Sequence, residues 1–113
     1  MEIGPSRILV VDEHPLVRVG LARVINREVD LEVCDETDVR SSLQAAAGLK
    51  PTVIIIDVSL NDTGFEILTS MRRILPAVKI LVLSMHDEMI YAKRALEAGA
   101  DGYISKDNAR KTS

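Results

Sequence analysis

Five residues capable of chemistry stand just after four strongly apolar segments of this chain. Asp12 and Glu13 follow RILVV, Asp57 follows TVIII, Ser84 follows KILVL, and Lys106 lies two residues past GYI. A carboxylate at the end of the most hydrophobic segment is unfavourable unless its charge is compensated. If these segment ends meet in space, three carboxylates, a hydroxyl and an ammonium group share one place.

The chemistry that suits this set is transfer of a phosphoryl group. Three carboxylates repel one another unless a cation lies among them, and a hard ion with oxygen ligands, Mg²⁺ or Mn²⁺, is the natural choice. An ionised Asp57 could then act as a nucleophile toward phosphorus. The cation and Lys106 would neutralise the transferring oxygens, and the Ser84 hydroxyl could donate to one of them.

The elements that must position these residues alternate along the chain. Apolar runs without polar alternation are typical of parallel strands buried on both faces, and segments of helical period separate them. An alternation of strands and helices predicts a doubly wound parallel sheet, whose functional crevice lies at the carboxyl ends of the strands. Strands are expected at residues 7–11, 31–34, 52–56, 79–83 and 102–104. Helices are expected from Pro15, from a cap at Asp38 through Ala47 with Gly48 and Pro51 ending it, over residues 67–75, and from a cap at Asp87 to just before Gly99.

The helical spacing also predicts which side chains face the core. The expected inner faces carry Val17, Leu21, Val24 and Ile25 in the first helix, Ile67, Leu68, Met71, Ile74 and Leu75 in the third, and Met89, Ala92, Ala95 and Leu96 in the fourth.

Composition narrows the class of protein. The 113 residues suit one domain, 1–113, and 47% hydrophobic residues allow a real, mainly aliphatic core. The net charge of -3 comes from interspersed signs, which argues against direct nucleic-acid contact. The lone Cys34, read as a small core residue, suits a reducing compartment, and no apolar run is long enough for a membrane span. We expect a cytoplasmic domain.

The chain resembles the receiver domain of two-component response regulators. The resemblance rests on ILVVDEHPLVRVGL, VIIIDVSL and VLSMHDE with ALEAGADGYISKD, and it covers residues 7–107. These segments are most similar to the subfamily whose receivers precede a helix-turn-helix output domain, the nitrate/nitrite-regulator or LuxR-type group. The resemblance implies a flavodoxin-like sheet of strand order 2-1-3-4-5.

The resemblance also implies a role for each residue of the set. Asp57 matches the phosphoacceptor, Glu13 a direct metal ligand, and Asp12 a metal partner acting largely through water. The remaining matches are the backbone carbonyl of Ser59 as a metal ligand, Ser84 as the switch hydroxyl, Lys106 as the phosphate-pairing lysine and Tyr103 as the switch aromatic. The implied partner is a sensor histidine kinase, with a possible homodimer, and the implied role is that of a non-enzymatic regulator that catalyses its own phosphotransfer and autodephosphorylation.

The chain departs from the family pattern at three places. Asn61 replaces a proline and Gly64 comes one residue early, so the loop after Asp57 is shortened. Glu13 replaces the commoner aspartate, which lengthens the arm that carries the carboxylate. Residues 106–113 are too few and too polar for a packed fifth helix, and residues 1–113 do not include the DNA-binding domain of that subfamily. We therefore expect one face of the sheet to be under-covered.

Each residue also has an ordinary structural explanation. Asp12 and Glu13 could be first-turn acids that favour the helix dipole, and Ser84 could be a cap. His14 and His86 are most simply solvated loop residues. Two other functions stay open: an interaction module that signals without phosphorylation, and a small Mg²⁺-dependent phosphatase. The phosphatase reading lacks an acid two residues after Asp57 and any cap insertion.

Overall fold

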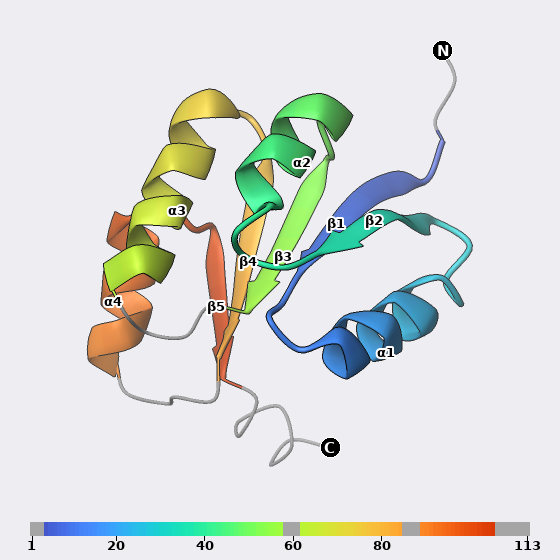
Figure 1. Ribbon diagram of the computed structural model, residues 1–113, viewed down its shortest axis with the longest axis horizontal. Helices are drawn as coiled ribbons and strands as arrows, with labels where there is room; N and C mark the ends of the chain where they lie inside the picture. Colours follow the sequence, from blue (N-terminus) through green and yellow to red (C-terminus); the bar gives the residue numbers. More distant parts are fainter. Residues whose placement is uncertain (1–3, 58–61, 85–88, 106–113) are drawn as a thin grey trace.

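Five parallel strands form one sheet flanked by four helices (Figure 1). The computed structural model describes residues 4–57, 62–84 and 89–105. The sheet order is β2-β1-β3-β4-β5, which confirms the predicted doubly wound topology. The elements are β1 (Ser6–Val11), α1 (Pro15–Ile25), β2 (Leu31–Thr37), α2 (Ser42–Leu49), β3 (Val53–Asp57), α3 (Asp62–Ile74), β4 (Lys79–Ser84), α4 (Met89–Glu97) and β5 (Gly102–Ser105).

The main core lies between the sheet and the layer of α2, α3 and α4 (Figure 1). Alternate strand residues point into it, and α3 contributes the largest helical share. Its largest fully buried side chains come from four elements: Leu9 and Val11 of β1, Ile54 and Ile56 of β3, Ile80 and Val82 of β4, and Leu68 and Met71 of α3. The central strands are thereby fixed in register, and so are their carboxyl ends.

The opposite face of the sheet is covered by α1 alone among the described residues (Figure 1). That helix packs on β1 and β2, where Ile8 and Val10 are buried. Farther along the sheet, Ile55 and Leu83 are only half-buried and Ile104 is 40% exposed. The described residues thus agree with the expected under-covered face.

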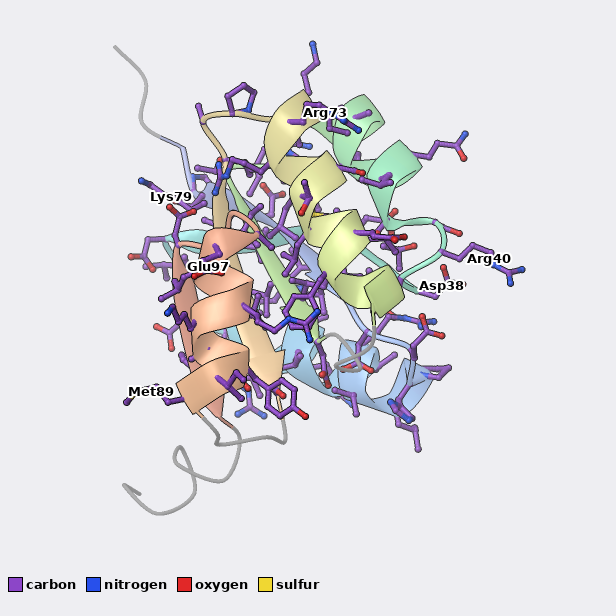
Figure 2. All side chains as sticks on the ribbon, turned by 90° about the vertical axis from the view of Figure 1, so that its left-hand side faces the viewer. Asp38, Arg40, Arg73, Lys79, Met89 and Glu97 are labelled. Carbon is purple, nitrogen blue, oxygen red and sulfur yellow. The ribbon has the colours of Figure 1, made fainter. Side chains whose placement is uncertain are left out.

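Several predicted inner faces need correction. In α1 the buried residue is Ala22. Val24, which was expected on the inner face, has 56% of its surface exposed. In α4, Ala95 is fully buried whereas Met89 and Leu96 point outward, Met89 from the first turn (Figure 2). Ile74 at the end of α3 is also exposed. Short helices contact the sheet along a narrow line, so only part of a predicted apolar stripe is covered.

The boundaries of α2 also differ from the prediction. The helix begins at Ser42, because the Asp38 carboxylate accepts from the Ser41 amide at 2.8 Å and closes a turn before the helix. That backbone hydrogen bond, followed by the Ser41 hydroxyl, lowers the pKa of Asp38. Gly48 does not end the helix. The helix ends at Leu49, and the C-cap residue Lys50 has a φ of 48° in the left-handed region.

Two glycines give opposite predictions for substitution by alanine. Gly48 lies inside α2 with nothing within 4 Å of an added Cβ, so Gly48→Ala should raise the free energy of unfolding by about 0.5–1 kcal/mol. Gly99 has a φ of 119°, and an added Cβ would lie 2.8 Å from Arg72 Cβ. Gly99→Ala should therefore lower the free energy of unfolding by roughly 1–3 kcal/mol. Urea denaturation of both variants measures these free energies, and equal effects of the two substitutions would contradict the prediction.

Candidate functional site

Strand register brings the predicted acids to one edge of the sheet. Val11 pairs with Ile56 across β1 and β3, so Asp12 and Asp57 come next at neighbouring strand ends. Neighbouring strands lie about 4.8 Å apart, which places the two acids close together. Asp57 pairs in turn with Leu83, the residue before Ser84. The predicted convergence of Asp12, Asp57 and Ser84 on the carboxyl edge therefore follows directly from the observed sheet.

Asp12 is buried and held by several contacts. It is 1% exposed, and its Oδ1 accepts from the His14 backbone N–H at 2.7 Å and lies 3.1 Å from His14 Nδ1. Arg18 Nη1 donates to the Asp12 carbonyl at 2.8 Å, and the Asp12 N–H donates to Thr37 O at 3.0 Å. The backbone of Asp12 is thus held by α1 and β2, and its carboxylate is held by His14, the residue before α1.

His14 and Arg18 are contacts that sequence reasoning missed. The His14 side chain is 78% exposed, as expected of a loop histidine, but its ring contacts Asp12. Arg18 also lies 3.7 Å from Glu36 of β2 and so joins that strand to the acidic loop. The sequence held one weak signal for Arg18, a basic residue on the first turn of the helix that follows the two acids.

Glu13 points to a different neighbour. Its Oε1 accepts from the Val39 N–H at 2.9 Å, and Val39 lies in the segment between β2 and α2. Helix α1 begins at Pro15 and has no acidic residue in its first turn. The explanation of Asp12 and Glu13 as first-turn acids therefore does not hold, because both residues precede the helix and make other contacts.

The remaining predicted residues divide into described and undescribed ones. Asp57 is half-buried at the end of β3, and Ser84 is 1% exposed at the end of β4. Tyr103 of β5 is half-buried and packs against the core cluster. The carbonyl of Ser59, the side chain of Lys106, the altered residue Asn61 and the loop histidine His86 lie outside the described residues.

The donor set fits a hard divalent cation in its chemistry. Carboxylate oxygens at neighbouring strand ends are the ligands that Mg²⁺ and Mn²⁺ prefer. Within the described residues, however, no three Asp, Glu, His or Cys side chains are gathered closely enough to hold a metal ion. The Glu13 carboxylate is engaged by the Val39 amide. Asp12, Glu13 and Asp57 are the acids that would hold the cation.

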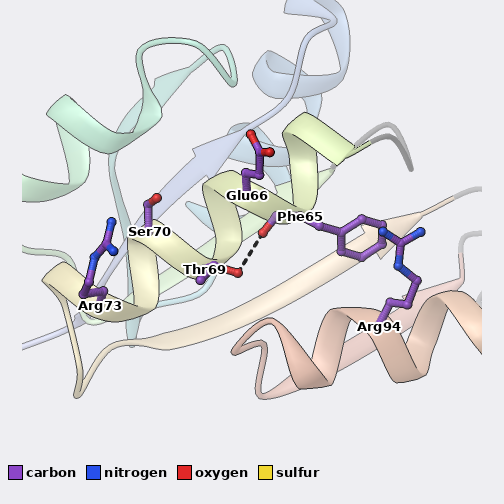
Figure 3. Close-up of a pocket in the computed structure, with 6 residues that line it drawn as sticks. All are labelled: Phe65, Glu66, Thr69, Ser70, Arg73 and Arg94. Atoms are coloured by element: carbon purple, nitrogen blue, oxygen red, sulfur yellow. Dashed lines mark hydrogen bonds between the residues drawn. The ribbon is translucent and has the colours of Figure 1, made fainter.

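A groove of about 540 Å³ lies elsewhere, between α3 and α4 (Figure 3). Its lining residues are Phe65, Glu66, Thr69, Ser70, Arg73 and Arg94, none of them a predicted site residue. The Arg94 guanidinium lies 4.1 Å from the centre of the Phe65 ring, a cation–π contact that joins α4 to α3. We therefore assign this groove to helix packing and place the candidate site at the sheet edge.

Comparison with known proteins identifies the class. Residues 8–112 match the family described as the response regulator receiver domain. The chain is 35% identical over 109 residues to the response regulator protein VraR of Staphylococcus aureus, covering 93% of this chain and 51% of VraR. It is 33% identical over 107 residues to the methanol utilization control regulatory protein MoxX of Paracoccus denitrificans, covering 92% of this chain and 48% of MoxX.

A solved structure supports the same placement. The crystal structure of a LuxR-family two-component response regulator from Aurantimonas has a TM-score of 0.84 and 33% identity, covering 96% of this chain and 81% of that one. The chain belongs to the response regulator receiver domain family. Its relatives are LuxR-type regulators, as the resemblance predicted, and it spans about half the length of the curated relatives named above.

Receiver domains of response regulators are signalling modules that work with histidine kinases. Among the described residues, no helix is both long and apolar enough to cross a bilayer.

Proposed function

We propose that this chain is a phosphoacceptor in which Asp57 takes a phosphoryl group from a histidine kinase. The observation that supports this most strongly is the register that sets the buried Asp12 beside Asp57, with Ser84 one strand away. Two carboxylates brought together at a sheet edge are unfavourable without a compensating function, and phosphoryl transfer with a bound cation supplies one.

The transfer step requires little of the protein beyond positioning. A carboxylate oxygen of Asp57 forms a bond to phosphorus as the P–N bond of the kinase phosphohistidine breaks, and the imidazole leaves with the electron pair. Lys106 pairs with the transferred oxygens, and Ser84 donates its hydroxyl to one of them. The same arrangement lets water attack the phosphorylated Asp57, which limits the lifetime of the signal.

Mg²⁺ or Mn²⁺, when bound, neutralises the charge of the carboxylates and the phosphoryl oxygens. Asp12, Glu13, Asp57 and the Ser59 carbonyl would hold it. The contacts of Asp12 with His14 orient its carboxylate before any cation is bound.

Phosphorylation adds roughly -1.5 to -2 charge at Asp57, enough to draw the Ser84 hydroxyl toward the phosphoryl group. Tyr103 lies on the adjacent strand and packs on the core, so its position can follow that shift. We infer that residues 1–113 are the receiver part of a longer regulator whose DNA-binding output responds to this change, with homodimerisation as one route.

The proposal predicts metal-dependent phosphorylation. Incubation with acetyl phosphate and Mg²⁺ should retard most of the protein on a Phos-tag gel, because the cation offsets the charge that Asp57 and the phosphoryl group bring together. Chelation with EDTA should reduce the retarded fraction at least tenfold, and Mn²⁺ should restore it. Tight partner binding with no retarded band in Mg²⁺ would instead favour the interaction module.

A further inference from the structure

Glu13 connects two loops that belong to different parts of the domain. Its carboxylate follows β1 at the candidate cation site, yet Oε1 accepts from the Val39 N–H, 26 residues farther along the chain. An aspartate at this position would be one methylene shorter. The longer arm of this chain is thus what makes the contact with Val39 possible.

Val39 lies at the entry to α2. Its carbonyl accepts from the Ser42 hydroxyl at 2.6 Å and from the Ser42 N–H at 3.2 Å, and Ser42 is fully buried at the first position of the helix. The neighbouring Ser41 N–H donates to Asp38 within the same turn. The Val39 N–H is therefore the point at which this turn is joined to the acidic loop.

In this structure the Glu13 carboxylate is held at the entry to α2 by the Val39 N–H. Asp12, Glu13 and Asp57 all lie within the described residues, and no three such side chains there are gathered closely enough for a metal ion. Mg²⁺ keeps several waters beside one or two carboxylates, and a further carboxylate within reach can replace one of those waters. Recruitment of Glu13 to a cation beside Asp12 and Asp57 would draw its carboxylate off Val39.

We propose that Glu13 is a latch between the cation site and the entry to α2. In the metal-free domain it holds the Val39 N–H, and in the metal-loaded domain the same carboxylate joins Asp12 and Asp57 and releases that N–H. The first turn of α2 thereby responds to cation loading, before any phosphoryl group arrives. This inference rests on the proposed function in one respect, namely that the acidic edge binds a divalent cation.

The test is water-exchange NMR of the Val39 amide with and without saturating Mg²⁺. In the unmodified chain, Mg²⁺ should speed Val39 exchange about fivefold, the effect of losing one hydrogen bond of ordinary strength. The Ser41 amide, bonded to Asp38 in the same turn, is the internal control and should not change. A Val39 amide that stays equally protected in Mg²⁺ would overturn the latch.

Two variants separate the two roles of Glu13. Glu13→Gln keeps an oxygen acceptor for Val39 but lacks the negative charge, so Val39 should remain protected with and without Mg²⁺. Glu13→Asp keeps a charge but is too short for Val39, so exchange should be fast in both conditions. Mg²⁺-dependent exchange of Val39 in Glu13→Gln equal to that of the unmodified chain would show that Glu13 is not responsible.

Mn²⁺ added to the same sample distinguishes failure of the latch from failure of the proposed function. Paramagnetic broadening of the Asp12 and Asp57 amides reports binding at the acidic edge. Broadening there with no change in Val39 exchange would overturn the latch alone. An edge that shows no broadening would overturn both proposals.

Discussion

Replacing Asp57 by asparagine is expected to abolish phosphorylation by acetyl phosphate in Mg²⁺. The amide of asparagine is not a nucleophile for phosphorus, and it removes one of the two acids that the β1–β3 register places side by side. On a Phos-tag gel the retarded band should disappear, and intact mass should show no added phosphoryl group.

Asp57→Asn should not destabilise the fold, which separates loss of chemistry from loss of structure. Asp12 and Asp57 occupy neighbouring strand ends, so removal of one charge relieves repulsion when no cation is bound. We expect a free energy of unfolding equal to that of the unmodified chain or higher by about 1 kcal/mol at neutral pH.

The matched control is Asp35→Asn, at an exposed position on the edge strand β2. Among the described residues Asp35 accepts a local hydrogen bond from the Glu36 N–H, and strand β1 separates β2 from β3. This variant should be phosphorylated like the unmodified chain. A retarded band that survives in Asp57→Asn would show that another residue is the acceptor.

The strands and the topology could be predicted because their signal is continuous. Runs such as Val53 to Ile56 are apolar at every position, as burial on both faces requires, and β3 was found within one residue of its expected bounds. The inner faces of the helices were predicted less well. Met89 and Leu96 satisfy helical spacing but lie outside the line along which α4 meets the sheet, and sequence periodicity does not determine that line.

In the candidate site, too, the features set by strand order could be predicted and the side-chain contacts could not. Its edge and its members at β1, β3 and β4 follow from the order of the strands, which the sequence predicts. The contacts of Glu13 with Val39 and of Arg18 with the Asp12 carbonyl do not, since they depend on side-chain rotamers and on the path of the segment before α2. Asp38 illustrates the limit, because a good capping residue stabilises a turn here and the helix begins four residues later.

At the opposite end of the sheet from the site, one arginine joins α3, β4 and the loop before β5. Arg72 Nε donates to Gly99 O at 2.9 Å, and Nη1 donates to Val78 O at 2.6 Å and to Pro76 O at 3.0 Å. Nη2 pairs with Asp101 Oδ2 at 2.6 Å, an oxygen that also accepts from the Ile80 N–H at 2.9 Å. No sequence motif marks this cluster, although it orders three segments.

Arg72→Ala is therefore expected to lower the free energy of unfolding by about 3 kcal/mol. Hydrogen bonds from a charged donor contribute about 1.5–3 kcal/mol, and several carbonyls would lose their donor at once. The ion pair with Asp101 adds little, since the Asp101 side chain is 44% exposed. Urea denaturation at neutral pH measures the change.

The neighbouring Arg73 provides the matched control. It is exposed at the end of α3 and points away from the sheet (Figure 2), so Arg73→Ala should change stability by less than about 0.5 kcal/mol. Equal effects of the two substitutions would show that the hydrogen bonds of Arg72 do not stabilise the fold.

The pH dependence of the Arg72→Ala effect follows from Asp101. The hydrogen bond from the Ile80 amide, followed by the Arg72 charge, lowers the pKa of Asp101 from its ordinary value of 3.8. A lowered folded-state pKa gives a contribution that is present above pH 3.8 and is lost as the pH falls through the folded-state value. The difference between Arg72→Ala and the unmodified chain should therefore be constant from neutral pH to about pH 5 and should narrow in stronger acid. A difference that widens there would contradict a stabilising contribution from the Arg72–Asp101 pair.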